Sequence, residues 1–270
     1  MKLTTLSRLF NDSLIYGIGG ILAKGVAFLT IPIYTHIFST SEFGRIELIS
    51  VISSFFSAIL TMGLDSAQSM YFFKHKNDGR DIQSNIISAI LQWRIIIGFI
   101  LVIIVTITSP LINKYFFDEP VSHICFILAF TNVFFCQLLV QSTEVLRLLF
   151  KPWSYILITF SQTILGALFI LLFVIYFDYN IKGYFLGLLM SSAIMAVVGW
   201  IFVRKYINFR KYHFDWWPKL LRFGAPLVPA SLGLYFMSSL DRWFVQYFHG
   251  NEALGLYALG AKFSMLMSLA

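Results

Sequence analysis

The sequence predicts an all-α polytopic membrane protein, because it is strongly apolar, carries few charges and collects its apolar residues in long runs. Hydrophobic residues make up 58% of the 270 positions, charged residues only 12%, and the mean hydropathy is +0.78. A soluble domain carries about 25% charged residues, so this chain lacks the polar surface of a soluble domain. The apolar runs suit helices that cross ~30 Å of hydrocarbon, which takes ~20 residues.

Eight apolar runs are long enough to be helical spans. They are too long and too uniformly apolar for the ~10-residue alternating strands of a membrane barrel. The first run exceeds the apolar core of a signal peptide and contains Lys24, so we expect it to be retained. The expected spans are 13–37, 43–73, 84–109, 122–146, 154–177, 183–203, 224–247 and 253–270.

The basic and aromatic connection 204–223 divides the chain. We expect a six-helix N-terminal lobe at 1–203, a linker at 204–223, and the first two helices of a second lobe at 224–270. Because the sequence stops inside an apolar run, we expect the second lobe to be incomplete. Interleaved basic and aromatic residues beside two spans are typical of a membrane-interface belt. We therefore expect membrane lipid, and no nucleic acid, as the partner of this linker.

The distribution of Lys and Arg predicts a cytoplasmic N-terminus. In that orientation thirteen basic residues lie on the cytoplasmic side, three on the other side and four within spans. Basic residues favour the cytoplasmic side of membrane proteins. The connections on the opposite side are short, so any function must reside within the membrane or at its surfaces.

The sequence contains no recognisable catalytic, nucleotide or metal motif. The glycine-rich stretch 17–25 lacks the Gly before Lys24 and the Ser or Thr after it that a phosphate loop requires. Cys125 and Cys136 lie within one apolar run, and no two histidines have metal-ligand spacing. We expect no enzymatic activity, no catalytic residue, no metal and no cofactor.

Besides Arg45, which we count with the outer side because it lies at the very start of span 43–73, eight charged residues lie within the expected spans. A charge at the centre of a span costs ~2.5–3.5 kcal/mol on insertion scales, so something must offset the cost. Two explanations stay open: the charges form structural ion pairs, or they face a water-filled cavity. The basic residues are Lys24, Arg94, Arg242 and Lys262, and the acidic residues are Glu47, Asp65, Glu144 and Asp241.

Two spans carry polar stripes. At 100° per residue, the stripe of span 43–73 falls within an arc of about 80°, and that of span 224–247 shares one face. Such stripes favour a face turned towards a water-filled cavity, although serines also allow close helix packing. The first stripe contains Glu47, Ser50, Ser54, Ser57, Thr61, Asp65 and Gln68, and the second contains Ser231, Tyr235, Ser238, Arg242, Gln246 and His249.

Lys24 and Lys262 lie deep in the membrane. At 1.5 Å per residue each is ~14–17 Å from the start of its span, and each has Gly and Ala on its own face, which leaves space around the ammonium. Arg94 lies equally deep but among Ile and Leu. We expect Lys24 and Arg94 to line a cavity, while for Lys262 a cavity position and a structural ion pair both stay open. Arg242 lies late in its span, so snorkelling to outer headgroups competes with a cavity role.

Three stretches carry a family resemblance. They are IPIYTHIFSTSEFGRIELIS at 31–50, MGLDSAQSMYFF at 62–73, and APLVPASLGLYFMSSLDRWFVQYFHGNEALGLYALGAKF at 225–263. The most similar features are Phe43-Gly44, Gly63-Leu64-Asp65 and Asp241-Arg242. The chain thereby resembles the polysaccharide flippase family, the O-antigen and capsule exporters of the multidrug/oligosaccharidyl-lipid/polysaccharide superfamily.

This resemblance implies a MATE-like fold with two six-helix lobes around a cationic central cavity. It also implies transport of an undecaprenyl-diphosphate-linked oligosaccharide across the bacterial cytoplasmic (inner) membrane by alternating access, in O-antigen, capsule or exopolysaccharide biosynthesis and so in lipopolysaccharide assembly. A polysaccharide polymerase and a chain-length regulator are the implied protein partners. Family members have more spans than the eight expected here, so the chain resembles a first lobe plus two further helices.

We assign expected roles on this basis. The diphosphate would bind the four intramembrane cations, Lys24, Arg94, Arg242 and Lys262. Sugar hydroxyls would bind the polar stripes, at Ser54, Thr61, Gln68, Tyr235 and Ser238. Ion coupling or gating would use Glu47, Asp65, Glu144 and Asp241. Two alternatives stay open, namely a drug/ion antiporter of the same superfamily, which should favour acidic cavity residues, and an integral-membrane polysaccharide polymerase or glycosyltransferase.

Overall fold

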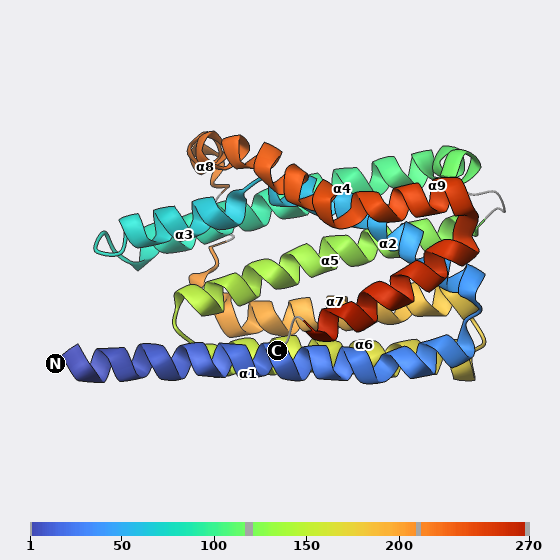
Figure 1. Cartoon of the computed structure of the whole chain (residues 1–270). Coiled ribbons are helices and arrows are strands. Elements are labelled where there is room, and N and C mark those ends of the chain that lie inside the picture. The colour runs from blue at the N-terminus through green and yellow to red at the C-terminus, as the bar shows by residue number, and fades with distance from the viewer. Residues whose placement is uncertain (1, 117–120, 209–211, 268–270) are drawn as a thin grey trace.

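The computed structural model describes residues 2–116, 121–208 and 212–267, and within these ranges the chain is helical without strands (Figure 1). This confirms the predicted all-α fold. Short π and 3-10 segments lie at Leu172–Tyr176, Arg204–Tyr206, Phe214–Trp216 and Ala225–Leu227. The α-helices are α1 (Lys2–Ile37), α2 (Thr40–Thr61), α3 (Leu64–Lys74), α4 (Arg80–Phe116), α5 (His123–Leu148), α6 (Pro152–Leu171), α7 (Asn180–Val203), α8 (Trp217–Gly224) and α9 (Val228–Met267).

Seven helical segments of the described chain are long and apolar enough to cross a membrane, where the sequence analysis expected eight spans. The difference lies in the last segment, which runs over 51 residues from Phe214 to Ser264. Gly250 interrupts α9 with φ 77° and ψ −175°, and there the helix turns back on itself (Figure 1). The two final predicted spans therefore correspond to the two arms of α9, a first arm (228–249) and a second arm (251–267).

The second predicted span, 43–73, is broken into α2 and α3. Met62 and Gly63 adopt left-handed conformations, with φ 40° and 66°, which a continuous right-handed helix cannot contain. A Cβ on Gly63 would overlap the backbone of Gly224 at the end of α8, so this position favours glycine for two reasons. The polar stripe expected along one helix face is therefore split between two helices.

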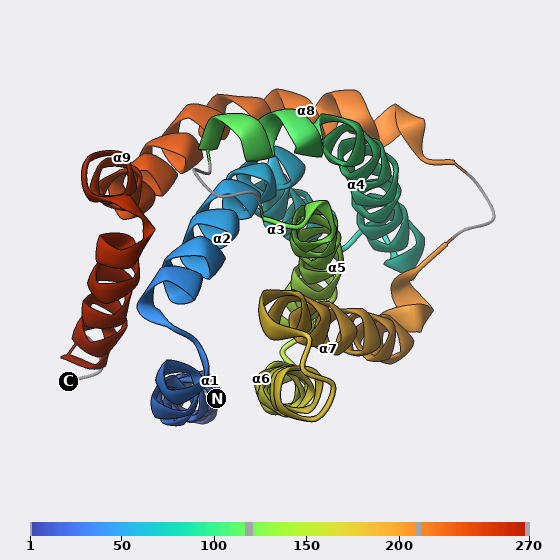
Figure 2. The same ribbon diagram turned by 90° about the vertical axis from the view of Figure 1, so that its right-hand side faces the viewer.

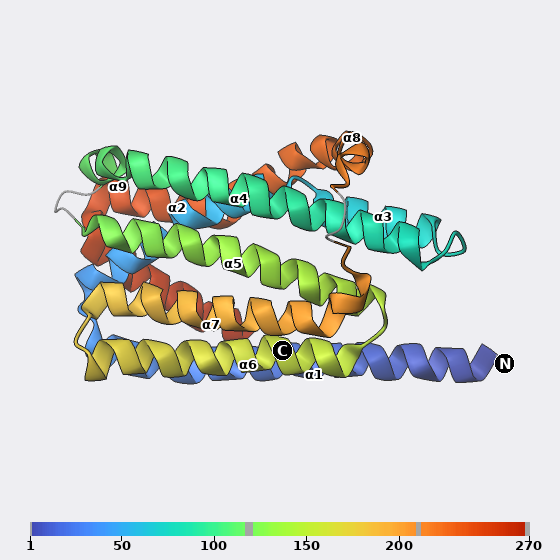
Figure 3. The ribbon, with the colours of Figure 1, turned by 180° about the vertical axis from the view of Figure 1, so that it is seen from behind.

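The first seven helices form a layered bundle in which α5 is central. It packs against α4 on one side and α7 on the other, while α6 lies on α7 and α1 on α6 (Figure 3). Phe126 on α5 and Ile46 and Leu48 on α2 are fully buried in the main core. Large apolar side chains such as Phe99 and Ile107 on α4 remain exposed, as expected for a surface that faces lipid rather than water.

The linker is docked on the end of α4 that carries Ser88 and Gln92. The Asn208 backbone NH donates to Ser88 Oγ at 2.7 Å, and the His213 NH donates to Gln92 Oε1 at 2.9 Å. The Trp217 indole NH donates to the Ala89 carbonyl at 3.0 Å. These bonds hold the start of α8 against the bundle, while the division into 1–203, 204–223 and 224–270 stays a prediction.

Both arms of α9 pack on α2. Two glycines, one on α2 and one on the second arm, set how closely these two segments approach each other. A Cβ on Gly44 would overlap the Asn251 carbonyl oxygen, and a Cβ on Gly255 would overlap the Thr40 carbonyl oxygen. The crossing of α2 with the second arm is therefore a backbone-to-backbone contact of the kind that small residues permit in membrane proteins.

We expect Gly255→Ala to destabilise the protein by about 1–3 kcal/mol, because the added methyl group forces the two backbones apart. The midpoint of thermal unfolding of the detergent-purified full-length protein measures this effect. Gly260→Ala on the same arm is the matched control, since a Cβ there has no neighbour within 4 Å and alanine favours helix. Equal midpoints for the two variants would contradict the close crossing.

Candidate functional site

A cavity of about 390 Å³ lies between α1, α6 and α7, with Phe43 of α2 and Lys262 of the second α9 arm completing its wall. Figure 2 views these helices nearly end-on, with α1 and α6 side by side and the second arm of α9 beyond α2. Helix α1 contributes Lys24, Thr30 and Tyr34. Among the described residues that line this cavity, two are basic and none is acidic.

Lys24 lies in the cavity as the sequence analysis expected. Within the described part of the chain, no ion pair or hydrogen bond involves its ammonium. A Cβ added at Gly17 or Gly20, on the Lys24 face of α1, would have no neighbour within 4 Å, whereas a Cβ at Gly19 would meet the Ile156 side chain of α6. The Lys24 face of this stretch is therefore open, and another face packs on α6. The Lys24 charge is thus available to a ligand.

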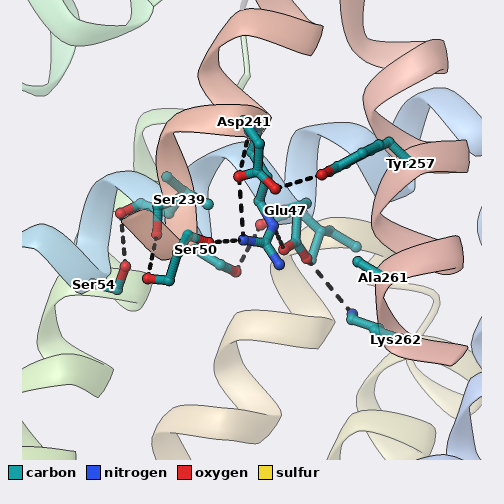
Figure 4. A network of polar contacts seen from close by, with 12 residues as sticks. Glu47, Ser50, Ser54, Ser239, Asp241, Tyr257, Ala261 and Lys262 are labelled. Atoms are coloured by element: carbon teal, nitrogen blue, oxygen red, sulfur yellow. Dashed lines mark hydrogen bonds and ion pairs between the residues drawn. The ribbon is translucent and has the colours of Figure 1, made fainter. Parts of the chain in front are cut away.

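Lys262 also lines the cavity but is partly neutralised. Its ammonium lies 3.6 Å from Glu47 Oε2 and 4.4 Å from the centroid of the Phe43 ring, and its side chain is 33% exposed. The carboxylate of Glu47, only 12% exposed, also receives Arg242, whose Nε lies 2.8 Å from Oε1 (Figure 4). One acid on α2 therefore holds two cations, one from each arm of α9.

Asp241 closes this charged cluster. Its carboxylate accepts a 2.5 Å hydrogen bond from the Tyr257 hydroxyl across the two arms, and lies 3.8 Å from Arg242 (Figure 4). The formal charges of Glu47, Asp241, Arg242 and Lys262 sum to zero. Lys24 is therefore the cation of the cavity that this cluster does not balance.

Arg94 lies outside the cavity, contrary to the expectation that it lines one. Its side chain is fully buried, and the guanidinium donates to Asp65 Oδ1 at 2.5 Å and to the Gln137 carbonyl at 2.6 Å. A desolvated guanidinium without such partners would be very costly. The structural ion pair, one of the two explanations left open by the sequence, describes Arg94. Arg242 is held in a similar way, because its guanidinium forms an ion pair with Glu47 and donates a hydrogen bond to the Ser238 carbonyl.

The polar stripes likewise do not line the cavity. They meet at helix contacts, where the Tyr235 hydroxyl donates to the Val51 carbonyl at 2.5 Å. Ser54, Thr61 and Ser238 donate their hydroxyls to carbonyls of their own helices. Gln68 is fully buried and accepts a 3.4 Å hydrogen bond from Gln141 of α5. Close packing, the alternative explanation of the stripes, therefore accounts for Tyr235 and Gln68, whereas Ser238 is exposed on the first arm of α9.

Each of the four acidic candidates forms an ion pair with a basic side chain. Glu47, Asp65 and Asp241 take the partners given above, and Glu144 pairs with Arg147 at 3.0 Å on α5. An ion-coupling or gating role for these four residues stays a prediction. The described residues contain no group of three His, Cys, Asp or Glu side chains able to hold a metal ion.

The sequence analysis missed the opposite wall of the cavity. Gln162 and Thr163 of α6 and Tyr184 and Ser191 of α7 line it. The run Ser161-Gln162-Thr163 in the middle of an apolar span was the signal that could have found it. Consecutive residues of a helix lie about 100° apart, so this run forms no stripe along one face of the kind that marked the other two spans.

Comparison with known proteins places this geometry in context. A family model described as "Polysaccharide biosynthesis protein" matches residues 9–270. The "Lsg locus putative protein 1" of Haemophilus influenzae is 27% identical over 268 residues. That match covers 97% of this chain but only 63% of the relative, so the chain spans less than two thirds of the relative's length.

Two solved structures show the same fold. The inward-facing conformation of a multidrug resistance MATE family transporter of the MOP superfamily matches with a TM-score of 0.70 at 15% identity, over 93% of this chain and 57% of that one. A MOP superfamily transporter from Pyrococcus furiosus, described as having a binding pocket of reverse polarity, matches with a TM-score of 0.57 at 16% identity, over 98% of this chain and 58% of that one. The MATE-like helical arrangement expected from the sequence is thereby confirmed.

Proposed function

Because the chain belongs to the polysaccharide biosynthesis protein family and has a MATE-like fold, we propose that it moves an undecaprenyl-diphosphate-linked oligosaccharide across the bacterial cytoplasmic membrane by alternating access. The multi-pass helical fold supplies the membrane-spanning body that such transport requires. The family and the fold are of the transporter type rather than of an enzyme type.

The observation that carries this proposal is the cationic cavity. Lys24 and Lys262 line it and no acidic side chain does so among the described residues. The diphosphate that joins the prenyl chain to the sugar is a dianion, and its transfer through hydrocarbon is prohibitive without compensating charge. The Lys24 ammonium offers most of that compensation, and Lys262, which Glu47 partly neutralises, adds a smaller share, while the prenyl tail stays in the lipid.

The size of the cavity suits part of such a substrate. Ligand sites commonly measure ~300–1,000 Å³, and this cavity holds about 390 Å³. A diphosphate with the adjoining sugar fits that space, and the rest of the oligosaccharide would extend beyond it. The polar, uncharged wall formed by α6 and α7 suits sugar hydroxyls.

A drug/ion antiporter is the second candidate within this fold. The similar multidrug transporter supports it, but export of organic cations favours acidic cavity residues, and the described lining has none. The P. furiosus transporter, described as having a pocket of reverse polarity and a different function, supports the idea that pocket charge follows substrate charge.

The test uses the full-length protein in a bacterial strain that lacks its own flippase. We expect lipid-linked oligosaccharide to reach the outer face of the membrane only when the protein is produced. In the same cells, resistance to cationic drugs and efflux of cationic dyes should not change. Drug efflux without oligosaccharide transfer would replace the proposal with the antiporter function.

The orientation proposed for this transporter places the N-terminus and α8 at the cytoplasmic face. Lys219 lies 4.7 Å above the Trp216 ring, a pairing suited to anionic headgroups at an interface. A polysaccharide polymerase and a chain-length regulator would then meet the transporter at the opposite face.

A membrane-impermeant maleimide tests this topology on intact cells. In an otherwise cysteine-free full-length chain, Lys182→Cys at the start of α7 should be labelled, because that end of α7 lies at the outer face of the cytoplasmic membrane in the proposed orientation. Lys76→Cys, between α3 and α4, is the matched control, and it should react only after the membrane is opened. The reverse labelling pattern would invert the orientation.

A further inference from the structure

The cavity has two walls of different chemistry. One wall, from α1 and the second arm of α9, carries Lys24 and Lys262. The other wall, from α6 and α7, carries polar but uncharged residues, chiefly Gln162, Thr163 and Ser191. A ligand in this cavity therefore meets cations on one side and neutral hydrogen-bonding groups on the other.

Most hydroxyls of the neutral wall are already used within their own helices. Thr163 donates to the Thr159 carbonyl at 3.1 Å, and Ser191 donates to the Leu188 carbonyl at 2.9 Å. The Gln162 amide, in contrast, has no hydrogen bond within the described part of the chain. An amide offers both donors and an acceptor, and the half-buried side chain of Gln162 lines the cavity, where a ligand can use them.

Small apolar residues line the cavity together with Gln162 and the polar Thr163 and Ser191. Gly166 lies one turn further along α6 on the same face, and Ala167 and Leu188 line the cavity beside it. An acetamido group consists of an amide and a methyl group, so its polar part matches the glutamine amide and its methyl group matches these small apolar neighbours. A sugar hydroxyl can form a hydrogen bond with the glutamine amide, but it has no methyl group to contact the small apolar neighbours.

We propose that the α6–α7 wall binds the sugar next to the diphosphate, and that Gln162 selects a sugar with an acetamido substituent. This proposal rests on the proposed function, since it takes the two lysines as the diphosphate subsite. The amide of Gln162 donates to the acetamido carbonyl and accepts from its NH, while the methyl group packs towards Gly166 and Ala167.

The test measures flipping by the full-length protein in proteoliposomes. The two probes are undecaprenyl-diphosphate-N-acetylglucosamine and undecaprenyl-diphosphate-glucose, which differ only in the acetamido group. We expect the wild type to favour the first probe, and Gln162→Leu to lower that preference about tenfold, the loss expected for one or two hydrogen bonds. Gln162→Asn, with the same amide on a shorter side chain, should retain part of the preference.

Thr159→Val is the matched control. It removes a hydroxyl from the same helix that donates to the Tyr155 and Ile156 carbonyls and does not line the cavity, so it should keep the wild-type preference. A wild type that flips both probes equally, or a Gln162→Leu variant that keeps the preference or loses both probes equally, overturns the assignment of Gln162. A wild type that flips neither probe instead contradicts the proposed function.

Discussion

Lys24→Ala should reduce the transfer of lipid-linked oligosaccharide about 10- to 100-fold, the effect of removing one charge-assisted interaction worth about 1.5–3 kcal/mol. Its ammonium lines the cavity and no described residue pairs with it, so its charge is available to the diphosphate. Lys262→Ala should reduce transfer less than Lys24→Ala does, because Glu47 already neutralises part of the Lys262 charge.

The measurement is the appearance of lipid-linked oligosaccharide at the outer face in a flippase-deficient strain, at matched amounts of protein in the membrane. Lys24→Arg should retain most of the transfer, since it keeps the charge. Lys76→Ala, which removes a cation from the loop between α3 and α4, is the control for net charge. Undiminished transfer in Lys24→Ala would remove the cationic cavity from the mechanism.

Arg94→Met should destabilise the protein by about 3 kcal/mol, because it leaves the Asp65 carboxylate without its partner. Asp65 is 29% exposed, which places the expected cost at the lower end of the range for a broken buried pair. The unfolding midpoint of the purified full-length protein in detergent measures it.

The double variant Arg94→Met, Asp65→Asn distinguishes a structural role from a binding role. It removes both charges together, so much of the lost stability should return, and transfer per folded molecule should match the wild type. Recovered stability with transfer lost would mean that the Arg94–Asp65 pair takes part in transport, in line with the roles that the sequence analysis first expected for these two residues.

The helices and their membrane location follow directly from composition, because long apolar runs with few charges can satisfy their backbone in lipid only as helices. The break inside span 43–73 does not follow in the same way. The left-handed residues Met62 and Gly63 end α2 where Gly224 of α8 meets it, and that close approach involves residues far apart in the sequence. At Gly250 the turn was expected, because spans were predicted on either side.

The candidate site was predictable only in part. The depth of Lys24 and Lys262, and the small residues beside them, indicated cavity-facing lysines, and both line the cavity. The helical repeat placed Ser54 and Tyr235 correctly on polar helix faces, but it does not predict which neighbouring helix each face contacts. Those faces pack against other helices, where their hydroxyls bond to backbone carbonyls.

The amino-acid sequence by itself determined that this protein is a bundle of apolar helices with cations buried in the membrane, since hydrophobicity and charge are properties of each residue. Only the tertiary structure decided which of those cations are already neutralised. Arg94 pairs with Asp65 and Arg242 pairs with Glu47, whereas Lys24 lines the cavity without such a partner among the described residues. An ion pair depends on the distance between side chains of different helices, and that distance is set by how the helices pack.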